Sequence, residues 1–210
     1  MALLVATTLN SELTNTGIPA EAADHALAAR ARRGDFRAFE ELVYRYRNDV
    51  FRLAFYYVHN REDAWDLAQD VFAKAFKGIK RFRGHGSFRA WLLRITANHC
   101  KDFLKKRKLP TVSLDAEEAA EPSEKVAPDP RRAIESKELG KAIQAAIDAL
   151  PEKHRRAFLL REMEDLSYSE MAVAMGCSQG TVMSRLHHAR KKLQSILADM
   201  GVVEGLSHDR

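Results

Sequence analysis

Polar and basic side chains gather between Gln179 and Lys191, where their spacing suits them to bind another molecule. Val182 and Leu186 stand at i and i+4, which predicts a helix with these two residues facing inward. The residues left on the outside are Gln179, Thr181, Ser184, Arg185, His187, His188, Arg190 and Lys191. A helix that is polar at its start and basic toward its end fits the major groove of DNA, where side chains reach the base edges.

The stretch before this helix predicts the element that positions it. A serine and a glutamate have capping-box spacing, and two apolar residues flank them as a hydrophobic staple. A glycine stands where a tight turn needs positive φ, and a further serine can cap the next helix. These positions are Leu166, Ser167, Glu170, Met171, Gly176 and Ser178. We therefore predict a helix-turn-helix over 166–193; the alternative interpretation is an ordinary helical hairpin.

A second basic group follows a glycine-broken loop. Arg94, Asn98, Lys101 and Lys105 recur at i, i+4, i+7 and i+11, so they share one face of a helix predicted from Ser87 to about Lys108. The loop and the start of this helix add Arg81, Phe82, Arg83, His85, Ser87, Phe88 and Trp91. Cations interleaved with aromatic rings suit single-stranded nucleic acid, because cations follow the phosphates while rings hold unstacked bases. The alternative is a solvated basic face.

An acidic stripe precedes this basic helix. Asp63, Asp66 and Asp70 stand at i, i+3 and i+7 of a helix that begins near Glu62, with Gln69 beside them. One interpretation is a solvated face with favourable negative charge near the helix N-terminus. The other is a docking surface for a basic protein, since negative charge repels DNA and attracts a positive patch.

The apolar pattern predicts helices that carry these groups. Gly34-Asp35 indicates a helix break and a cap. The residues that follow recur in steps of three and four and predict a long amphipathic helix: Phe36, Phe39, Val43, Tyr46, Val50, Leu53 and Tyr57. A later stripe of Leu139, Ile143, Ala146 and Leu150 predicts another, and Pro151 starts a helix over about 152–162.

The order of these segments predicts an all-α chain with two small helical domains. We expect a flexible tail over 1–23, a first domain over 24–108, a second over 133–200 and a tail over 201–210. Residues 109–132 are rich in proline and acid, so they cannot bury a core and are expected to form a flexible tether. The tether is either a spacer or, by hypothesis, an acidic segment that lies in a basic channel of a partner.

Composition gives weaker indications. The net charge is +5, and the two cysteines give no disulfide framework, which suggests a reducing compartment. The start of the chain lacks the pattern of a signal peptide, and no stretch has the apolar length of a membrane span. We therefore expect a cytoplasmic protein without membrane insertion.

An enzyme or metal site is an alternative that the residues favour less. His99-Cys100, Cys177 and His187-His188 are the candidate ligands. Adjacent residues do not easily converge on one ion, and no close-spaced ligand quartet is present. There is also no glycine-rich phosphate loop, so we expect no metal, no cofactor and no catalysis.

Taken in order, these segments resemble the extracytoplasmic-function group of the bacterial sigma-70 family. The resemblance covers about 24–197. It rests on five segments in the right order: Gly34-Asp35 with Phe39, DAWDLAQDVFAKAF, GSFRAWLLRITANHCKDFLKKRK, Leu150-Pro151 and LSYSEMAVAMGCSQGTVMSRLHHARKKL. It implies regions 2 and 4 of a sigma factor, which binds core RNA polymerase and directs it to promoter DNA.

The resemblance also implies roles for the groups above. Asp66, Gln69, Asp70 and Phe72, with Asp63 beside them, match the part that binds the polymerase β′ clamp. The loop from Arg81 to Ser87 and the helix with Asn98 match the part that captures −10 bases. Thr181, Ser184, Arg185 and His188 fall in the helix that reads the −35 element, in a domain expected at the β flap.

Three positions depart from the family pattern. Met183 stands where Lys or Arg is frequent, His187-His188 where aromatic or basic residues are frequent, and Trp65 at a position that is usually acidic. They leave open which −35 sequence the chain prefers. The family also implies an anti-sigma factor as a partner. The alternative function is a stand-alone helix-turn-helix regulator that does not enter the polymerase.

Overall fold

The structure is a computed structural model that describes residues 20–82, 84, 86–107 and 130–202, with the backbone alone at residue 20 and over 130–137. Most of the predicted tether over 109–132, Arg83, His85 and most of both predicted tails lie outside these residues, and the last part of the predicted tether belongs to a helix that begins at Pro130. Within the described ranges the chain is helical and contains no strand, which confirms the all-α prediction. No described helix is long and apolar enough to cross a membrane.

The first half contains α2 (Ala20–Arg32), α3 (Phe36–Val58), α4 (Arg61–Gly78), the short 3₁₀ helix η1 (Ile79–Arg81) and α5 (Phe88–Arg107). Asp35 caps α3 by accepting from the Ala38 amide at 3.1 Å, which confirms the predicted break. Asn60 caps α4 by accepting from the amides of Glu62 and Asp63. The expected N-terminal tail differs at its end, because α2 already begins at Ala20.

The second half contains α6 (Pro130–Asp148), α7 (Glu152–Phe158), the π-helical turn η2 (Leu159–Met163), α8 (Tyr168–Met175) and α9 (Gln179–Asp199). The capping box of Ser167 and Glu170 is present, and Gly176 adopts φ 63° at the C-cap of α8. Ser178 caps α9 by accepting from the Thr181 amide at 3.2 Å. The helix-turn-helix therefore has the local structure that the sequence predicts.

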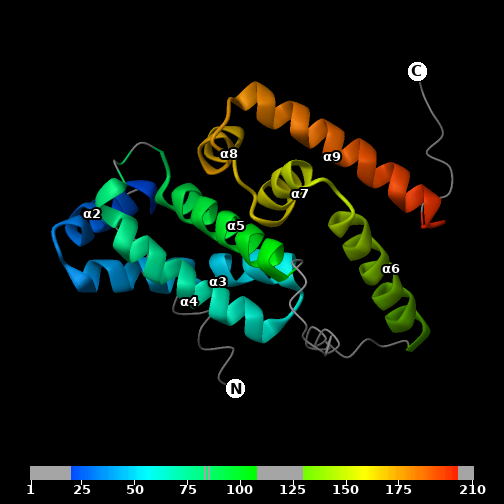
Figure 1. Cartoon of the computed structure of the whole chain (residues 1–210), viewed down its shortest axis with the longest axis horizontal. Coiled ribbons are helices and arrows are strands. Elements are labelled where there is room, and N and C mark those ends of the chain that lie inside the picture. The colour runs from blue at the N-terminus through cyan, green and yellow to red at the C-terminus, as the bar shows by residue number, and fades with distance from the viewer. Residues whose placement is uncertain (1–19, 83, 85, 108–129, 203–210) are drawn as a thin grey trace.

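The two halves pack against one another. Figure 1 shows α5 between the α2–α4 group and the helices α7 and α8, and α5 contacts α8 directly. One apolar core runs across the contact and includes Leu93 and Ala97 of α5 with Leu160 and Ala174 of the second half. The sequence had indicated two domains joined by a tether. The shared core shows that the two halves also contact one another directly, which the spacing of residues within a single helix could not predict.

Three residues predicted to face the core are exposed instead. Phe36 is 56% exposed at the start of α3, where its ring meets one side chain of α4, Phe76, edge-on with centroids 5.7 Å apart. Leu139 and Ile143 are 46% and 38% exposed, while Ala146 and Leu150 of the same stripe are buried. Over the described side chains of α6, burial therefore increases toward the C-terminal end of the helix.

Candidate nucleic-acid and polymerase interfaces

The predicted −35 surface lies on α9 and faces solvent. Gln179, Ser184, His187, His188, Arg190 and Lys191 are exposed, whereas Thr181 and Arg185 are half-buried. Val182 and Leu186 on the opposite side are buried, as the spacing predicted. The first turns of the second helix of this motif are the part that reaches base edges in DNA complexes. The predicted set therefore lies along one helix, at the positions that such a motif uses.

Local contacts set the direction of several of these side chains. The Arg185 guanidinium donates to Cys177 Sγ at 3.6 Å, which directs it toward the turn, and Arg190 pairs with Glu162 at 2.7 Å. The rings of His188 and His154 stack with centroids 5.8 Å apart. Burial, and then the nearby charge of His188, lower the pKa of His154 below its ordinary value.

The predicted −10 surface lies on α5. Arg94, Asn98, Lys101 and Lys105 are exposed on one face of this helix, as predicted. Two of them touch the second half: Arg156 donates to Asn98 Oδ1 at 2.8 Å, and the Arg94 guanidinium lies 3.4 Å from the place where a Gly176 Cβ would stand. This surface is therefore in contact with the helix-turn-helix domain.

Two aromatic residues predicted to hold −10 bases are buried in the core. Phe82 and Phe88 are 4% and 1% exposed, and each packs against Trp91 with ring centroids 5.4 Å apart. A ring with no free face cannot stack on a base, so direct base contact by Phe82 or Phe88 is wrong for this arrangement. Trp91 is half-buried and keeps a free edge. Ser87 is also buried, because its Oγ caps α5 at the Ala90 amide.

The predicted polymerase surface lies on α4. Asp66, Gln69 and Asp70 are exposed, Asp63 and Phe72 half-buried. Asp70 pairs with His99 of α5 at 3.0 Å, and Asp63 with Arg107 at 3.0 Å. The three aspartates line a groove between α4 and α5, together with Lys74 of α4 and with His99 and Lys105 of the opposite wall. A separate apolar groove lies between α3 and α4 and is lined in part by Phe36, Tyr44, Phe72 and Phe76. Phe72 is the member of the predicted set that reaches this second groove, so the acidic and the aromatic surfaces lie on different faces of α4.

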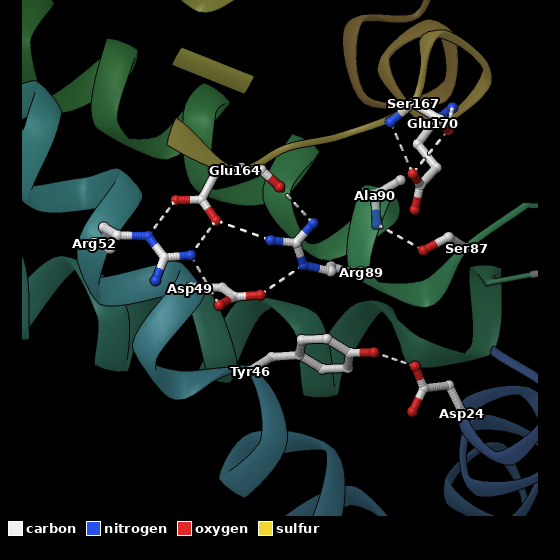
Figure 2. Close-up of polar contacts among 10 residues, drawn as sticks. All are labelled: Asp24, Tyr46, Asp49, Arg52, Ser87, Arg89, Ala90, Glu164, Ser167 and Glu170. Atoms are coloured by element: carbon white, nitrogen blue, oxygen red, sulfur yellow. Dashed lines mark hydrogen bonds and ion pairs between the residues drawn. The ribbon is translucent and has the colours of Figure 1, made fainter. Parts of the chain in front are cut away.

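A cluster that the sequence did not reveal joins the two halves. Figure 2 shows Arg52 and Arg89 on either side of the Glu164 carboxylate, with Asp49 beneath them. Arg52 pairs with Glu164 at 2.7 Å and Arg89 at 3.0 Å, while Arg89 also pairs with Asp49 at 2.6 Å. Burial raises the pKa of the Glu164 carboxyl, and the hydrogen bond from Arg52 acts in the opposite direction. We call these residues the Glu164 cluster.

The fold defines an all-α protein with a helix-turn-helix in its second half and an exposed acidic face on α4. The family models described as "Sigma-70 region 2" and "Sigma-70, region 4" match residues 42–109 and 140–193. The chain belongs to the sigma-70 family of RNA polymerase sigma factors, in its extracytoplasmic-function group.

Two relatives match this chain over nearly their whole length. The RNA polymerase sigma-H factor of Pseudomonas aeruginosa is 37% identical over 180 residues, which are 83% of this chain and 93% of the relative. The ECF RNA polymerase sigma-E factor of Escherichia coli K12 is 37% identical over 178 residues, with shares of 82% and 93%.

Two solved structures have a similar fold. CnrH, in complex with the cytosolic domain of CnrY, has a TM-score of 0.63 at 26% identity and covers 84% of this chain and 98% of its own. The sigma factor RpoE of Bartonella quintana, in complex with the anti-sigma factor NepR, has a TM-score of 0.58 at 24% identity, with shares of 76% and 96%.

These findings decide between the functions that the sequence left open. The chain is an alternative sigma factor that binds core RNA polymerase and directs promoter-specific initiation, and the stand-alone regulator is not favoured because both sigma regions are present. Among the described residues, no group of three or more His, Cys, Asp or Glu side chains is placed to hold a metal ion.

Proposed function

We propose that α4 docks on the β′ clamp of the polymerase through Asp63, Asp66, Gln69, Asp70 and Phe72. The exposure of Asp66, Gln69 and Asp70 supports this assignment, and Phe72 adds the apolar groove on another face of α4. Charged side chains select the partner and speed the encounter, and exposed aromatic surface supplies affinity. The helix-turn-helix domain then lies at the β flap.

We further propose that α5 captures −10 bases and that α9 reads the −35 element. On α5, Arg94, Asn98, Lys101 and Lys105 follow the strand, together with Arg81 and Trp91, and the buried Phe82, Ser87 and Phe88 hold the helix and its loop in place. Arg83 and His85 complete the loop but lie outside the described residues. On α9 the readers are Gln179, Thr181, Ser184, Arg185, His187 and His188, with Arg190 and Lys191 on phosphates.

The energy of DNA opening supports this division between the chain and the polymerase. A bubble of roughly twelve base pairs costs about 17 kcal/mol at about 1.4 kcal/mol per step. A stacked base returns only about 1–3 kcal/mol, and two of the candidate rings on this surface are buried. The chain therefore holds a few bases while the polymerase supplies the rest. The chemistry belongs to the polymerase, so the chain itself is not an enzyme and acts in the cytoplasm, where the polymerase lies.

We also propose that an anti-sigma factor regulates the chain. The sigma factor RpoE of Bartonella quintana, which has a similar fold, is bound to the anti-sigma factor NepR in its solved structure. The expected surfaces are those that the polymerase and promoter use, since occupying either one prevents initiation.

Asn98, which lies at the centre of the proposed −10 surface, provides a test of the −10 assignment. Run-off transcription with core polymerase, on promoters mapped with and without this chain, measures start-site selection. We expect Asn98→Ala to weaken initiation in a way that depends on the base at one −10 position, with Asp102→Ala on another face of α5 as control. Initiation that does not depend on the chain at any mapped promoter would contradict the proposed function.

A further inference from the structure

Glu164 is a carboxylate without exposed surface, and both of its cationic partners come from the other half of the protein. Its side chain is 0% exposed, and the arginines that pair with it lie 112 and 75 residues earlier in the sequence. A buried carboxylate needs such partners, because removing a charge from water costs several kcal/mol unless it is paired. The turn after η2 can therefore bury Glu164 in this way only while the two halves are together.

The same arrangement touches the proposed −10 surface at Asn98 and Arg94. Arg156 holds the side-chain oxygen of Asn98, and α8 lies against α5. At the N-terminal end of α5, the nearest Val173 carbon is 3.2 Å from the place where a Gly86 Cβ would stand. A base that enters at Asn98 must replace the hydrogen bond from Arg156, and a strand along Arg94 meets the turn at Gly176. Binding of the −10 strand and this contact are therefore in competition.

We propose that the Glu164 cluster holds the free chain in a self-inhibited state. In this state the helix-turn-helix domain lies against the −10 surface, and Asp49, Arg52, Arg89 and Glu164 fix the two halves in that position. Capture of the −10 strand requires that the halves separate, which exposes Glu164 to water and frees Asn98. The inference rests on the proposed −10 surface and adds an internal regulator to it.

The cluster suits this task better than apolar packing alone. A buried ion pair adds little net stability, since desolvation offsets its attraction, but it penalises every arrangement that leaves one charge buried and unpaired. Arg52 is 42% exposed and Arg89 23%. Both arginines therefore remain hydrated when the halves separate. The contact between the halves therefore requires one particular geometry, and it can break and form again.

A reversible disulfide tests the proposal. An ideal Cβ at Gly86 would lie 4.0 Å from Val173 Cβ, within the range of a disulfide. The Gly86→Cys, Val173→Cys pair is made with Cys177→Ser, because Cys177 is one turn from position 173 and could pair with the new thiol. Cys100 can stay, since burial raises the pKa of its thiol to about 12 and keeps it unreactive.

The readouts are binding of a labelled single-stranded −10 oligonucleotide, taken from a promoter mapped with this chain, and run-off transcription with core polymerase. We expect the oxidised full-length chain to lose at least about tenfold in oligonucleotide affinity, about 1.4 kcal/mol, and to regain it with dithiothreitol. Gly86→Cys with Cys177→Ser is the matched control, because it has the same backbone strain at φ +83° without the cross-link. A cross-linked chain that binds the strand as well as the reduced one overturns the proposal.

A second variant tests Glu164 itself. Glu164→Gln keeps the size of the side chain and removes its charge, so we expect a larger radius of gyration and at least about tenfold tighter oligonucleotide binding. Glu162→Gln, two residues away and exposed, is the control. An unchanged radius and affinity overturn the role of Glu164. The proposed function is judged separately, by whether the reduced, uncross-linked chain initiates transcription.

Discussion

The two helices proposed to meet promoter DNA, α5 and α9, differ in what they touch. On α9 the outward residues face solvent, with Met183 51% exposed among them. On α5 two of the four outward residues contact the other half of the protein. The proposed −35 surface therefore makes no contact with the other half of the protein at these residues, whereas the proposed −10 surface shares Arg94 and Asn98 with the contact between the halves. We therefore expect recognition to begin at the −35 element or on the polymerase, with the −10 strand captured afterwards.

The largest expected effect concerns the Glu164 cluster, which joins the two halves of the protein and so brings the helix-turn-helix domain against α5. Arg89→Met removes the pairing of Arg89 with Asp49 and Glu164 and leaves two carboxylates with one arginine. We expect the free energy of unfolding to fall by about 2–3 kcal/mol, less than for a fully buried pair because Arg89 is partly exposed. Urea denaturation of the full chain measures it.

The control for this change is Arg107→Met, which removes an exposed pair with Asp63 and should cost less than about 1 kcal/mol. If the two variants lose the same free energy of unfolding, the Glu164 cluster stabilises the contact between the halves no more than an exposed ion pair would. The contrast between α5 and α9 would then weaken.

The second effect concerns Arg185 on α9. If its guanidinium leaves Cys177 to meet a base edge, Arg185→Ala should cost about 1–3 kcal/mol at a single −35 position. Transcription from promoters substituted at each −35 base gives the pattern. A uniform loss over all sequences would make Arg185 a phosphate contact instead, and Lys191→Ala, at a proposed phosphate contact, provides the reference for such a uniform loss.

A third effect, of about 1 kcal/mol, concerns Met183. The Met183 side chain is 51% exposed on the outward face of α9, where it is free to contact another molecule. An apolar side chain at this place suits the methyl group of thymine. Replacing single −35 thymines by deoxyuridine should weaken binding of the natural chain at one position and have no effect there in Met183→Ala. Equal sensitivity of both chains would exclude the contact.

The smallest effect is a pH dependence on the same domain. The pKa of His154 is lowered in the folded state, so the unfolded chain takes up a proton first as the pH falls. The contribution of neutral His154 to stability is therefore complete above its ordinary pKa of 6.5 and is lost as the pH falls below it. Between about pH 7.5 and pH 5.5 the melting temperature should fall by up to about 2 °C more than in His154→Asn. An identical fall in both chains would contradict this.

The sequence predicted the features that short segments determine. The capping box of Ser167 and Glu170, the positive φ of Gly176 and the cap at Asp35 each depend on residues within a few positions of one another. The exposed faces of α4, α5 and α9 followed from helical spacing in the same way. These signals are local, so one chain was enough to find them.

Features that depend on distant residues were missed or misassigned. Phe82 and Phe88 were assigned to bases because aromatic residues among cations have the same pattern whether they are exposed or buried. Leu139 and Ile143 were assigned to the core because periodicity does not show where the neighbouring helix ends. The Glu164 cluster had no signal at all, since a glutamate and an arginine more than a hundred positions apart carry no spacing that links them.

The π-helical turn η2 has a consequence for how variants of this chain behave. A π turn holds one residue more than an α turn, and each residue of an α-helix advances the chain by about 100° around its axis. Deleting one residue from Leu159–Met163 would convert this turn to ordinary α-helix and leave the direction of Glu164 nearly unchanged, because five residues of a π turn and four of an α turn cover about the same rotation. The Glu164 cluster therefore tolerates the loss of one residue here, whereas the same deletion within a regular α-helix would turn every later side chain by about 100°.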